Sequence, residues 1–105
     1  MRRGEVFRLR LGRREGHEQA GVRYGVIVQS DALMRLSTVL IAPTSTSARP
    51  ASFRPEIGID GTPTRVLVEQ TGAVDVTRLG DYHDQLTAEE MWGVDLALET
   101  VLDLQ

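Results

Sequence analysis

Short strand-like segments follow one another along most of this chain, and no segment of helical length separates them. Apolar and polar residues alternate, or β-branched residues run together, in residues 5–11, 23–30, 37–43, 53–59 and 64–70. Two parallel strands need a crossover of about a dozen residues or more, which is usually a helix. The spacing therefore excludes a sheet of βαβ units and predicts an antiparallel, partly closed barrel of about five to seven strands.

The C-terminal segment has a helical period instead. Four apolar residues share one face of a helix there: Met91, Val94, Leu98 and Val101. Thr87 and Glu90 have the spacing of a capping box, which predicts where this helix begins. Gly93 in its interior costs on the order of 1 kcal/mol relative to Ala and leaves room for another element to approach. We expect a mainly β fold with one C-terminal helix packed on the barrel.

Prolines and glycines indicate where the strands end. Pro43 is expected to stop the strand at residues 37–43, and Pro55, which has no N–H to donate, predicts an edge position for residues 53–59. Three glycines make residues 12–21 a loop. Shorter pieces complete the chain: a turn at residues 60–63, a strand at 72–76, and a helical turn and strand at 77–86.

Composition narrows the class of protein. A length of 105 residues with ordinary apolar content predicts a single domain over residues 1–105. No apolar run approaches the roughly 20 residues of a membrane span, and the N-terminal segment lacks the pattern of a signal peptide. The chain has no cysteine and two histidines, so we expect no disulfide, no metal and no cofactor. A cytoplasmic location without membrane partners is the expectation.

Charge is distributed unevenly along the chain. Residues 1–35 hold eight arginines against four acidic residues, whereas residues 36–105 hold four arginines against eleven acidic residues. The chain has no lysine, which is either the composition of its genome or a use of the bidentate guanidinium for phosphate. The asymmetry predicts a cationic face for an anion on a protein of net charge -3.

Arg23 and a run of hydroxyls are the first candidates for chemistry. Arg23 stands at the start of one strand, and Thr44, Ser45 and Thr46 stand at the end of the next. If the two strands are antiparallel, these ends lie side by side, and the arginine and hydroxyls together form a phosphate-binding site. The alternatives are a solvated arginine and ordinary turn-forming hydroxyls.

Other polar residues have both a chemical and an ordinary interpretation. His17 and His83 are either an acid–base pair of the kind that cleaves RNA or unrelated histidines, with His83 at the surface. Glu69 either satisfies neighbouring amides or pairs with an arginine and orients it. The further candidates for catalysis or RNA binding are Glu18, Gln19, Tyr24 and Gln70.

Several short motifs, in this order along the chain, resemble the MazF/PemK type of toxin endoribonuclease. They are RRGEV (2–6), GHEQAGVR (16–23), VIVQSD (26–31), VLIAPTSTS (39–47), LVEQ (67–70) and VDLALETVLDL (94–104). The resemblance spans residues 2–104. It implies a small SH3-like barrel that forms a homodimer, cleaves single-stranded RNA at a short sequence without a metal, and is neutralised by a cognate antitoxin.

The resemblance also implies roles for individual residues. Arg23 corresponds to the catalytic arginine of the family, and the catalytic threonine falls on Ser45, with Thr44 and Thr46 on either side. The chain departs from the family at Tyr24, where a proline is usual, and at Gly72, where an arginine is common. The implied reaction is attack of the ribose 2′-OH on the adjacent phosphorus, which leaves a 2′,3′-cyclic phosphate and a 5′-OH end.

Two other functions remain open from the sequence. One is a non-catalytic toxin of the CcdB type, which has a similar barrel and binds DNA gyrase. The other is a degenerate paralogue that binds antitoxin or RNA and cleaves poorly. Whichever function holds, the chain is expected to form a homodimer, because it has apolar residues beyond those needed for one core face: Trp92, Leu96 and Leu104.

Overall fold

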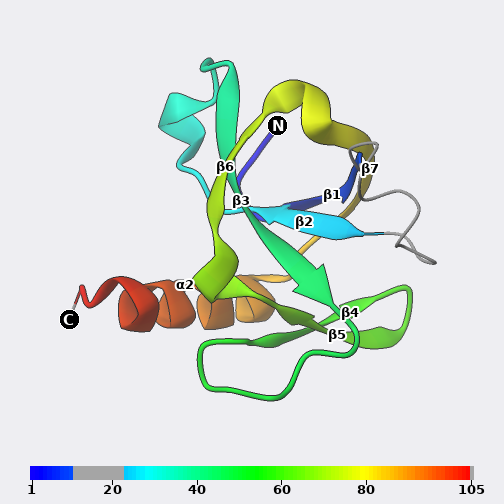
Figure 1. Ribbon diagram of the computed structural model, residues 1–105, viewed down its shortest axis with the longest axis vertical. Helices are drawn as coiled ribbons and strands as arrows, with labels where there is room; N and C mark the ends of the chain where they lie inside the picture. The colour runs from blue at the N-terminus through cyan, green and yellow to red at the C-terminus, as the bar shows by residue number, and fades with distance from the viewer. Residues whose placement is uncertain (11–22, 105) are drawn as a thin grey trace.

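The computed structural model describes residues 1–10 and 23–104, which form a curved seven-stranded antiparallel sheet with a helix across one end (Figure 1). The strands are β1 (Glu5–Leu9), β2 (Tyr24–Ile27), β3 (Thr38–Ser45), β4 (Glu56–Ile59), β5 (Thr62–Val66), β6 (Gly72–Asp75) and β7 (Leu79–Gln85). The helix is α2 (Ala88–Leu102), and the 3-10 turns are η1 (Asp31–Leu33), η2 (Val68–Gln70) and η3 (Val76–Arg78). The expected fold class, mainly β with a C-terminal helix, is confirmed.

Strand β3 is the centre of the sheet because it changes partners along its length. The strand order is β4-β5-β3-β2-β1-β7, and β6 pairs with the other side of β3. Its first half lies between β2 and β6, with Ile41 opposite both Ile27 and Gly72, and its last residues pair with β5. This bend curves the sheet into a partly closed barrel, and it brings the start of β2 close to the β4–β5 hairpin.

The expectation that Pro43 ends its strand is wrong. Strand β3 continues to Ser45, with Pro43 opposite Gly25 of β2. The pairing with β6 ends at Ile41 and the pairing with β5 begins at Thr44, so the missing N–H of Pro43 falls where β3 changes partner. The carbonyl oxygen of Pro43 still accepts a hydrogen bond from the Leu67 N–H at 2.8 Å.

The strand expected at residues 64–70 is also shifted. Strand β5 begins at Thr62 and ends at Val66, and Val68 starts the 3-10 turn η2. Pro63 is tolerated because it pairs with Gly58 of β4, beyond the part of β5 that pairs with β3. The β4 strand lies at the sheet edge, as Pro55 predicts, and begins directly after that proline.

Two apolar clusters, on opposite faces of the sheet, form the core. Alternation along β2 sends Val26 into the cluster beneath α2 and Ile27 into the cluster enclosed by β1, β3 and β7. Helix α2 contributes Val94 and Ala97, both buried, and its predicted capping box at Thr87 and Glu90 is present. Val101, expected on the buried face, is exposed because the C-terminal end of α2 extends past the sheet (Figure 1).

Among the described residues, no helix is both long enough and apolar enough to cross a membrane.

Candidate active site

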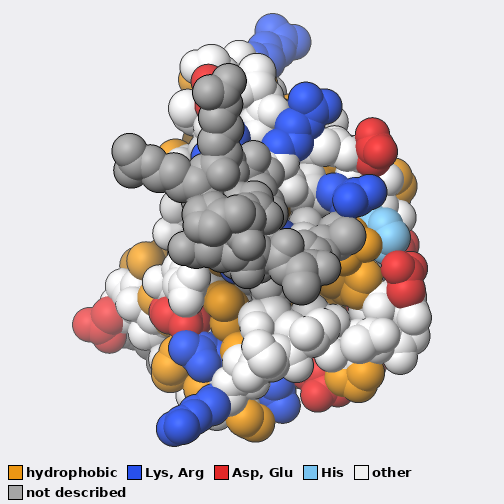
Figure 2. Space-filling model, turned by 45° about the vertical axis from the view of Figure 1, so that its right-hand side comes forward, with side chains coloured by type: hydrophobic (Ala, Val, Ile, Leu, Met, Phe, Trp, Pro, Cys, Tyr) orange, Lys and Arg blue, Asp and Glu red, His pale blue; other side chains and the backbone are white. Residues whose placement is uncertain are grey.

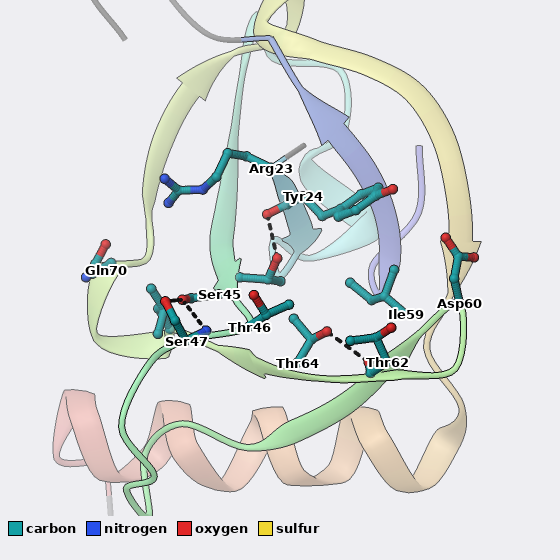
Figure 3. Close-up of a pocket in the computed structure, with 12 residues that line it drawn as sticks. Arg23, Tyr24, Ser45, Thr46, Ser47, Ile59, Asp60, Thr62, Thr64 and Gln70 are labelled. Carbon is teal, nitrogen blue, oxygen red and sulfur yellow. Dashed lines mark hydrogen bonds between the residues drawn. The ribbon is translucent and has the colours of Figure 1, made fainter. Parts of the chain in front are cut away.

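A cavity of about 500 Å³ opens where β2 begins, β3 ends and the β4–β5 hairpin turns back (Figure 3). Strand β2 and the residue before it supply Tyr24 and Arg23, and the end of β3 supplies residues 44–47. Gln70 of η2 closes one end, and hairpin residues within 59–64 form the opposite end. The walls are therefore built largely from hydroxyls, one cation and one carboxylate, which suits a polar ligand.

The antiparallel register explains why Arg23 lies beside the hydroxyls. Gly25 lies opposite Pro43, so Tyr24 and Arg23 fall beside the last residues of β3. The Thr44 hydroxyl donates a hydrogen bond to the Tyr24 carbonyl oxygen at 3.2 Å, and the Leu9 N–H donates to the Arg23 carbonyl oxygen at 2.9 Å. The expected juxtaposition is confirmed, with the Arg23 backbone bonded to β1 and the Tyr24 backbone bonded to β3.

The side chain of Arg23 has an unsatisfied donor. Its Nε–H is buried and has no hydrogen-bond partner among the described residues. In Figure 3 the guanidinium extends along the cavity toward the end closed by Gln70. A buried donor on a cation is costly without a partner, whereas an anion would satisfy both its charge and its hydrogen bond. This side chain is a ready contact for a phosphate oxygen.

The three hydroxyls at the end of β3 differ in their contacts. Thr44 is buried, and its hydroxyl is engaged with the Tyr24 carbonyl oxygen. Ser45 Oγ accepts from the Ser47 N–H at 3.2 Å and lies 3.4 Å from Ser47 Oγ. Thr46 is exposed, its hydroxyl points into the cavity in Figure 3, and it makes no hydrogen bond within the described part of the chain.

Glu69 pairs with an arginine, and that arginine is Arg54. The Nε and terminal nitrogen of Arg54 donate to Glu69 Oε2 at 2.9 and 2.6 Å. These hydrogen bonds hold the pKa of Glu69 below its usual value. Arg54 also donates to the Arg49 carbonyl oxygen at 3.2 Å. The pair ties the β3–β4 connection to η2, which presents the neighbouring Gln70 to the cavity, but Glu69 itself does not line it.

The far end of the cavity was not expected from the sequence, and it is formed by Asp60, Thr62 and Thr64 of the β4–β5 hairpin. The Asp-Gly pair in the predicted turn was the available signal for a polar hairpin tip. His83, expected at the surface, is half-buried and hydrogen-bonds Asp60. His17, Glu18 and Gln19 lie outside the described residues. Within residues 1–10 and 23–104, no three acidic or histidine side chains are grouped to hold a metal ion.

Comparison with known proteins decides the family. A family model of the PemK-like, MazF-like toxins of type II toxin–antitoxin systems matches residues 2–102. The chain belongs to this family. It is 43% identical over 104 residues to the candidate toxin Rv3098A of Mycobacterium tuberculosis, covering 97% of each chain. It is 32% identical over 111 residues to endoribonuclease EndoA of Bacillus subtilis, covering 99% of this chain and 96% of EndoA.

Solved structures agree with this MazF-like assignment. A mycobacterial endoribonuclease in complex with its cognate antitoxin superposes with a TM-score of 0.83 at 25% identity, covering all of this chain and 97% of that one. MazF of Deinococcus radiodurans in a MazE–MazF crystal superposes with a TM-score of 0.81 at 19% identity, covering 100% and 97% of the two chains. At 19% identity, the similarity to the Deinococcus radiodurans structure is evidence for the fold alone.

The two departures of this MazF-like toxin from its family lie at the cavity or beside it. Tyr24 lines the cavity, and its ring lies against His83 with centroids 4.7 Å apart. Gly72 starts β6, two residues after the cavity residue Gln70. A Cβ built on Gly72 would have its nearest neighbour, the Gln70 carbonyl oxygen, at 3.9 Å, so a side chain fits there.

Proposed function

We propose that this toxin is an endoribonuclease that cleaves single-stranded RNA without a metal, with Arg23 as the group that binds the scissile phosphate. The observation that carries the proposal is the buried, unpartnered Nε–H of Arg23 in a cavity lined by hydroxyls. The endoribonuclease names of EndoA and MazF relatives support the activity. This function accounts for a buried Arg23 Nε–H that has no hydrogen-bond partner among the described residues.

The proposed chemistry needs a nucleophile that the RNA itself provides. The ribose 2′-OH loses its proton and attacks the adjacent phosphorus, the bond to the 5′ oxygen breaks, and that oxygen takes up a proton. Negative charge grows on the non-bridging oxygens, where Arg23 and a hydroxyl from residues 44–46 donate hydrogen bonds. Arg23 is a poor base because its pKa lies above about 12. We assign one proton transfer to His17, so His17→Ala is expected to alter the pH dependence of cleavage.

The surface around the cavity suits a nucleic-acid strand. Three arginines are exposed near this strand: Arg8 on β1, Arg10 just after β1, and Arg78 on η3. Strand β1 pairs with β2, which carries Tyr24. Figure 2 shows arginine side chains leading down one side of this face to the histidine. Such a track binds the RNA backbone without reading its sequence. We place the activity in the cytoplasm, in a homodimer, and we infer neutralisation by a cognate antitoxin, because a related endoribonuclease is seen in complex with its antitoxin.

Metal-independent cleavage by Arg23 can be tested directly. The purified chain is incubated with a long single-stranded RNA in EDTA, and the new ends are mapped. We expect discrete cuts that leave 5′-OH ends, and a rate about 10²–10³-fold lower for Arg23→Ala, the usual cost of losing such a donor. The matched control is Arg35→Ala, which removes an equal charge from an exposed site away from the cavity.

Cuts that persist in Arg23→Ala would remove Arg23 from the catalytic role. An absence of cuts on any RNA would favour a degenerate toxin or one that binds gyrase. Cleavage that EDTA abolishes would contradict the metal-independent mechanism.

A further inference from the structure

Three side chains meet at the end of the cavity opposite Gln70: Asp60, His83 and Tyr24. The His83 Nε2 lies 3.0 Å from each carboxylate oxygen of Asp60, and the His83 ring lies against the Tyr24 ring. Asp60 and Tyr24 both line the cavity, together with the buried side chain of Ile59. The proposed reaction gives no role to this end, so a carboxylate there needs another explanation.

The position of Asp60 is fixed by its turn. Ile59 pairs with Thr62, so Asp60 and Gly61 form a two-residue hairpin loop. Both have positive φ, 53° and 78°, as a type I′ turn requires. His83 of β7 then holds the carboxylate from a different strand of the sheet. The carboxylate side chain remains 68% exposed, so its outward lone pairs are free to accept a hydrogen bond from a ligand.

The chemistry of this end matches a nucleobase. Tyr24 and Ile59 offer an apolar surface on which a base can pack, and single-stranded RNA presents bases that are free to leave the stack. A fixed carboxylate accepts from an exocyclic amino group, as on cytosine, adenine or guanine. It repels the carbonyl oxygens that flank the single N–H of uracil. The ligand is therefore a base that carries an amino group.

We propose that Asp60, positioned by His83, and Tyr24 form a subsite that selects an amino-bearing base next to the scissile phosphate. Arg23 and Asp60 lie at opposite ends of the cavity in Figure 3, so one group binds the phosphate and the other reads the neighbouring base. This inference rests on the proposed function, and it assigns part of the RNA sequence selectivity to Asp60 and Tyr24.

The test measures binding separately from cleavage. Short RNAs with 2′-fluoro sugars have no nucleophile, so they bind without being cut. Each amino-bearing base is replaced in turn by its analogue without the amino group, and affinity is measured by fluorescence anisotropy. At one position we expect wild-type protein to bind the amino form about tenfold more tightly, the usual effect of a hydrogen bond to a charged group.

Asp60→Gly should bring the ratio of affinities for the amino form and its analogue close to one, because glycine keeps the positive φ of the turn and removes the carboxylate. The matched control is Asp103→Gly, which removes an exposed carboxylate at the same backbone conformation, φ 56°, outside the cavity. It should leave the ratio at about tenfold. His83→Phe keeps a ring against Tyr24 and should lower the ratio, because the carboxylate loses its partner.

Mapped cuts on natural RNA separate this inference from the proposed function. Wild-type cuts should share an amino-bearing base at a fixed position, and Asp60→Gly should cut with that preference lost. The subsite is overturned, and the proposed nuclease activity stands, if cleavage shows no such preference. The same holds if Asp60→Gly leaves unchanged the ratio of affinities for RNA with and without the amino group. RNA that binds with an Asp60-dependent ratio and is never cut overturns the nuclease and leaves the subsite. Absence of binding overturns both.

Discussion

The three adjacent hydroxyls at the end of β3 have unequal access to a ligand. Family motifs place the catalytic hydroxyl on Ser45 with a threonine on either side, and sequence spacing alone does not separate the three. The contacts distinguish them, because the Thr44 hydroxyl donates to the Tyr24 carbonyl oxygen and Ser45 Oγ accepts from the Ser47 N–H, whereas Thr46 faces the cavity without a hydrogen bond within the described residues. Thr44 would have to give up a donated bond to reach a phosphate oxygen, so Thr46, whose hydroxyl has no bond to lose, is the first candidate to test.

Thr44→Val should lower the stability of the protein, whereas Thr46→Val should lower its cleavage rate. Thr44→Val keeps the shape of the side chain but leaves the Tyr24 carbonyl oxygen without its donor, so we expect a loss of about 1 kcal/mol in the free energy of unfolding. Thr46→Val should leave stability unchanged and lower the cleavage rate about tenfold or more. Thermal unfolding and initial cleavage rates measure the two effects. Full activity of Thr46→Val would return the role to Ser45.

Gly72 stands where an arginine is common in the family, so restoring an arginine there tests what that residue contributes. The position has space for a Cβ and its φ is not in the left-handed region, so Gly72→Arg should fold normally. An arginine beside the cavity should add about one phosphate contact, which tightens RNA binding and steepens its dependence on salt by about one unit.

The matched control is Gly72→Ala, which adds the Cβ without the charge and should bind RNA like the wild type. Anisotropy titrations with 2′-fluoro RNA at several salt concentrations give both quantities. An affinity gain that does not change with salt would mean that the arginine contacts no phosphate.

At the scale of elements, a glycine in a helix and a glycine in a strand should respond differently to alanine. A Cβ on Gly93 of α2 would lie 3.5 Å from the Cβ of Pro55, an ordinary contact, so Gly93→Ala should stabilise the protein by about 1 kcal/mol. A Cβ on Gly80 of β7 would lie 3.1 Å from the Arg8 carbonyl oxygen, so Gly80→Ala should destabilise it. Chemical denaturation measures both, and a destabilised Gly93→Ala would contradict the helix argument.

The Arg54–Glu69 pair should make stability depend on pH. Hydrogen bonds from Arg54 lower the pKa of Glu69 in the folded protein from its usual 4.5. A lowered carboxyl pKa stabilises the folded state above 4.5, and this contribution is lost as the pH falls through the folded value. Arg54→Gln should therefore be less stable than the wild type at neutral pH, with a difference that shrinks in acid. A difference that is constant with pH would exclude the ion pair as its cause.

The elements show what local sequence can and cannot predict. The β-branched runs and the capping box at Thr87 predict the strands and α2 because both patterns act within a few residues. Pro43 misleads because its effect depends on the change of partner along β3, which only the assembled sheet determines. In the sequence Glu69 continues the pattern of a strand, yet it belongs to the 3-10 turn η2 and is bonded by Arg54 from the β3–β4 connection.

For the whole molecule, the site divides into a predictable end and an unpredictable one. Arg23 and residues 44–46 come together through a single antiparallel pair, so adjacency of two strands was enough to place them side by side. Asp60 and His83 are 23 residues apart on elements that are not paired, and their contact depends on closure of the barrel. The end of the cavity assigned to phosphate could therefore be predicted from the sequence, and the end assigned to a base could not.

At the scale of the whole molecule, the remaining prediction is that the chain forms a homodimer. Large apolar side chains remain exposed on the outer face of α2 and at its end: Trp92, Leu96, Leu102 and Leu104. Trp92 is 65% exposed, although it carries the largest apolar side chain in the protein, and this exposure favours burial against a second copy. Sedimentation equilibrium at micromolar concentration should give twice the chain mass of 11.6 kDa.

Replacing Trp92 and Leu96 together by serine should weaken the dimer, because both belong to the same exposed stripe of α2. The matched control replaces Leu33 and Leu36, which are also exposed and lie in or near η1, and should leave the dimer intact. A wild-type monomer at micromolar concentration would contradict the homodimer. A dimer that is lost in the control pair and kept in the helix pair would instead place the interface near η1, which precedes the start of β3, whereas the β4–β5 hairpin pairs with its end. Helix α2 would then be free for the antitoxin.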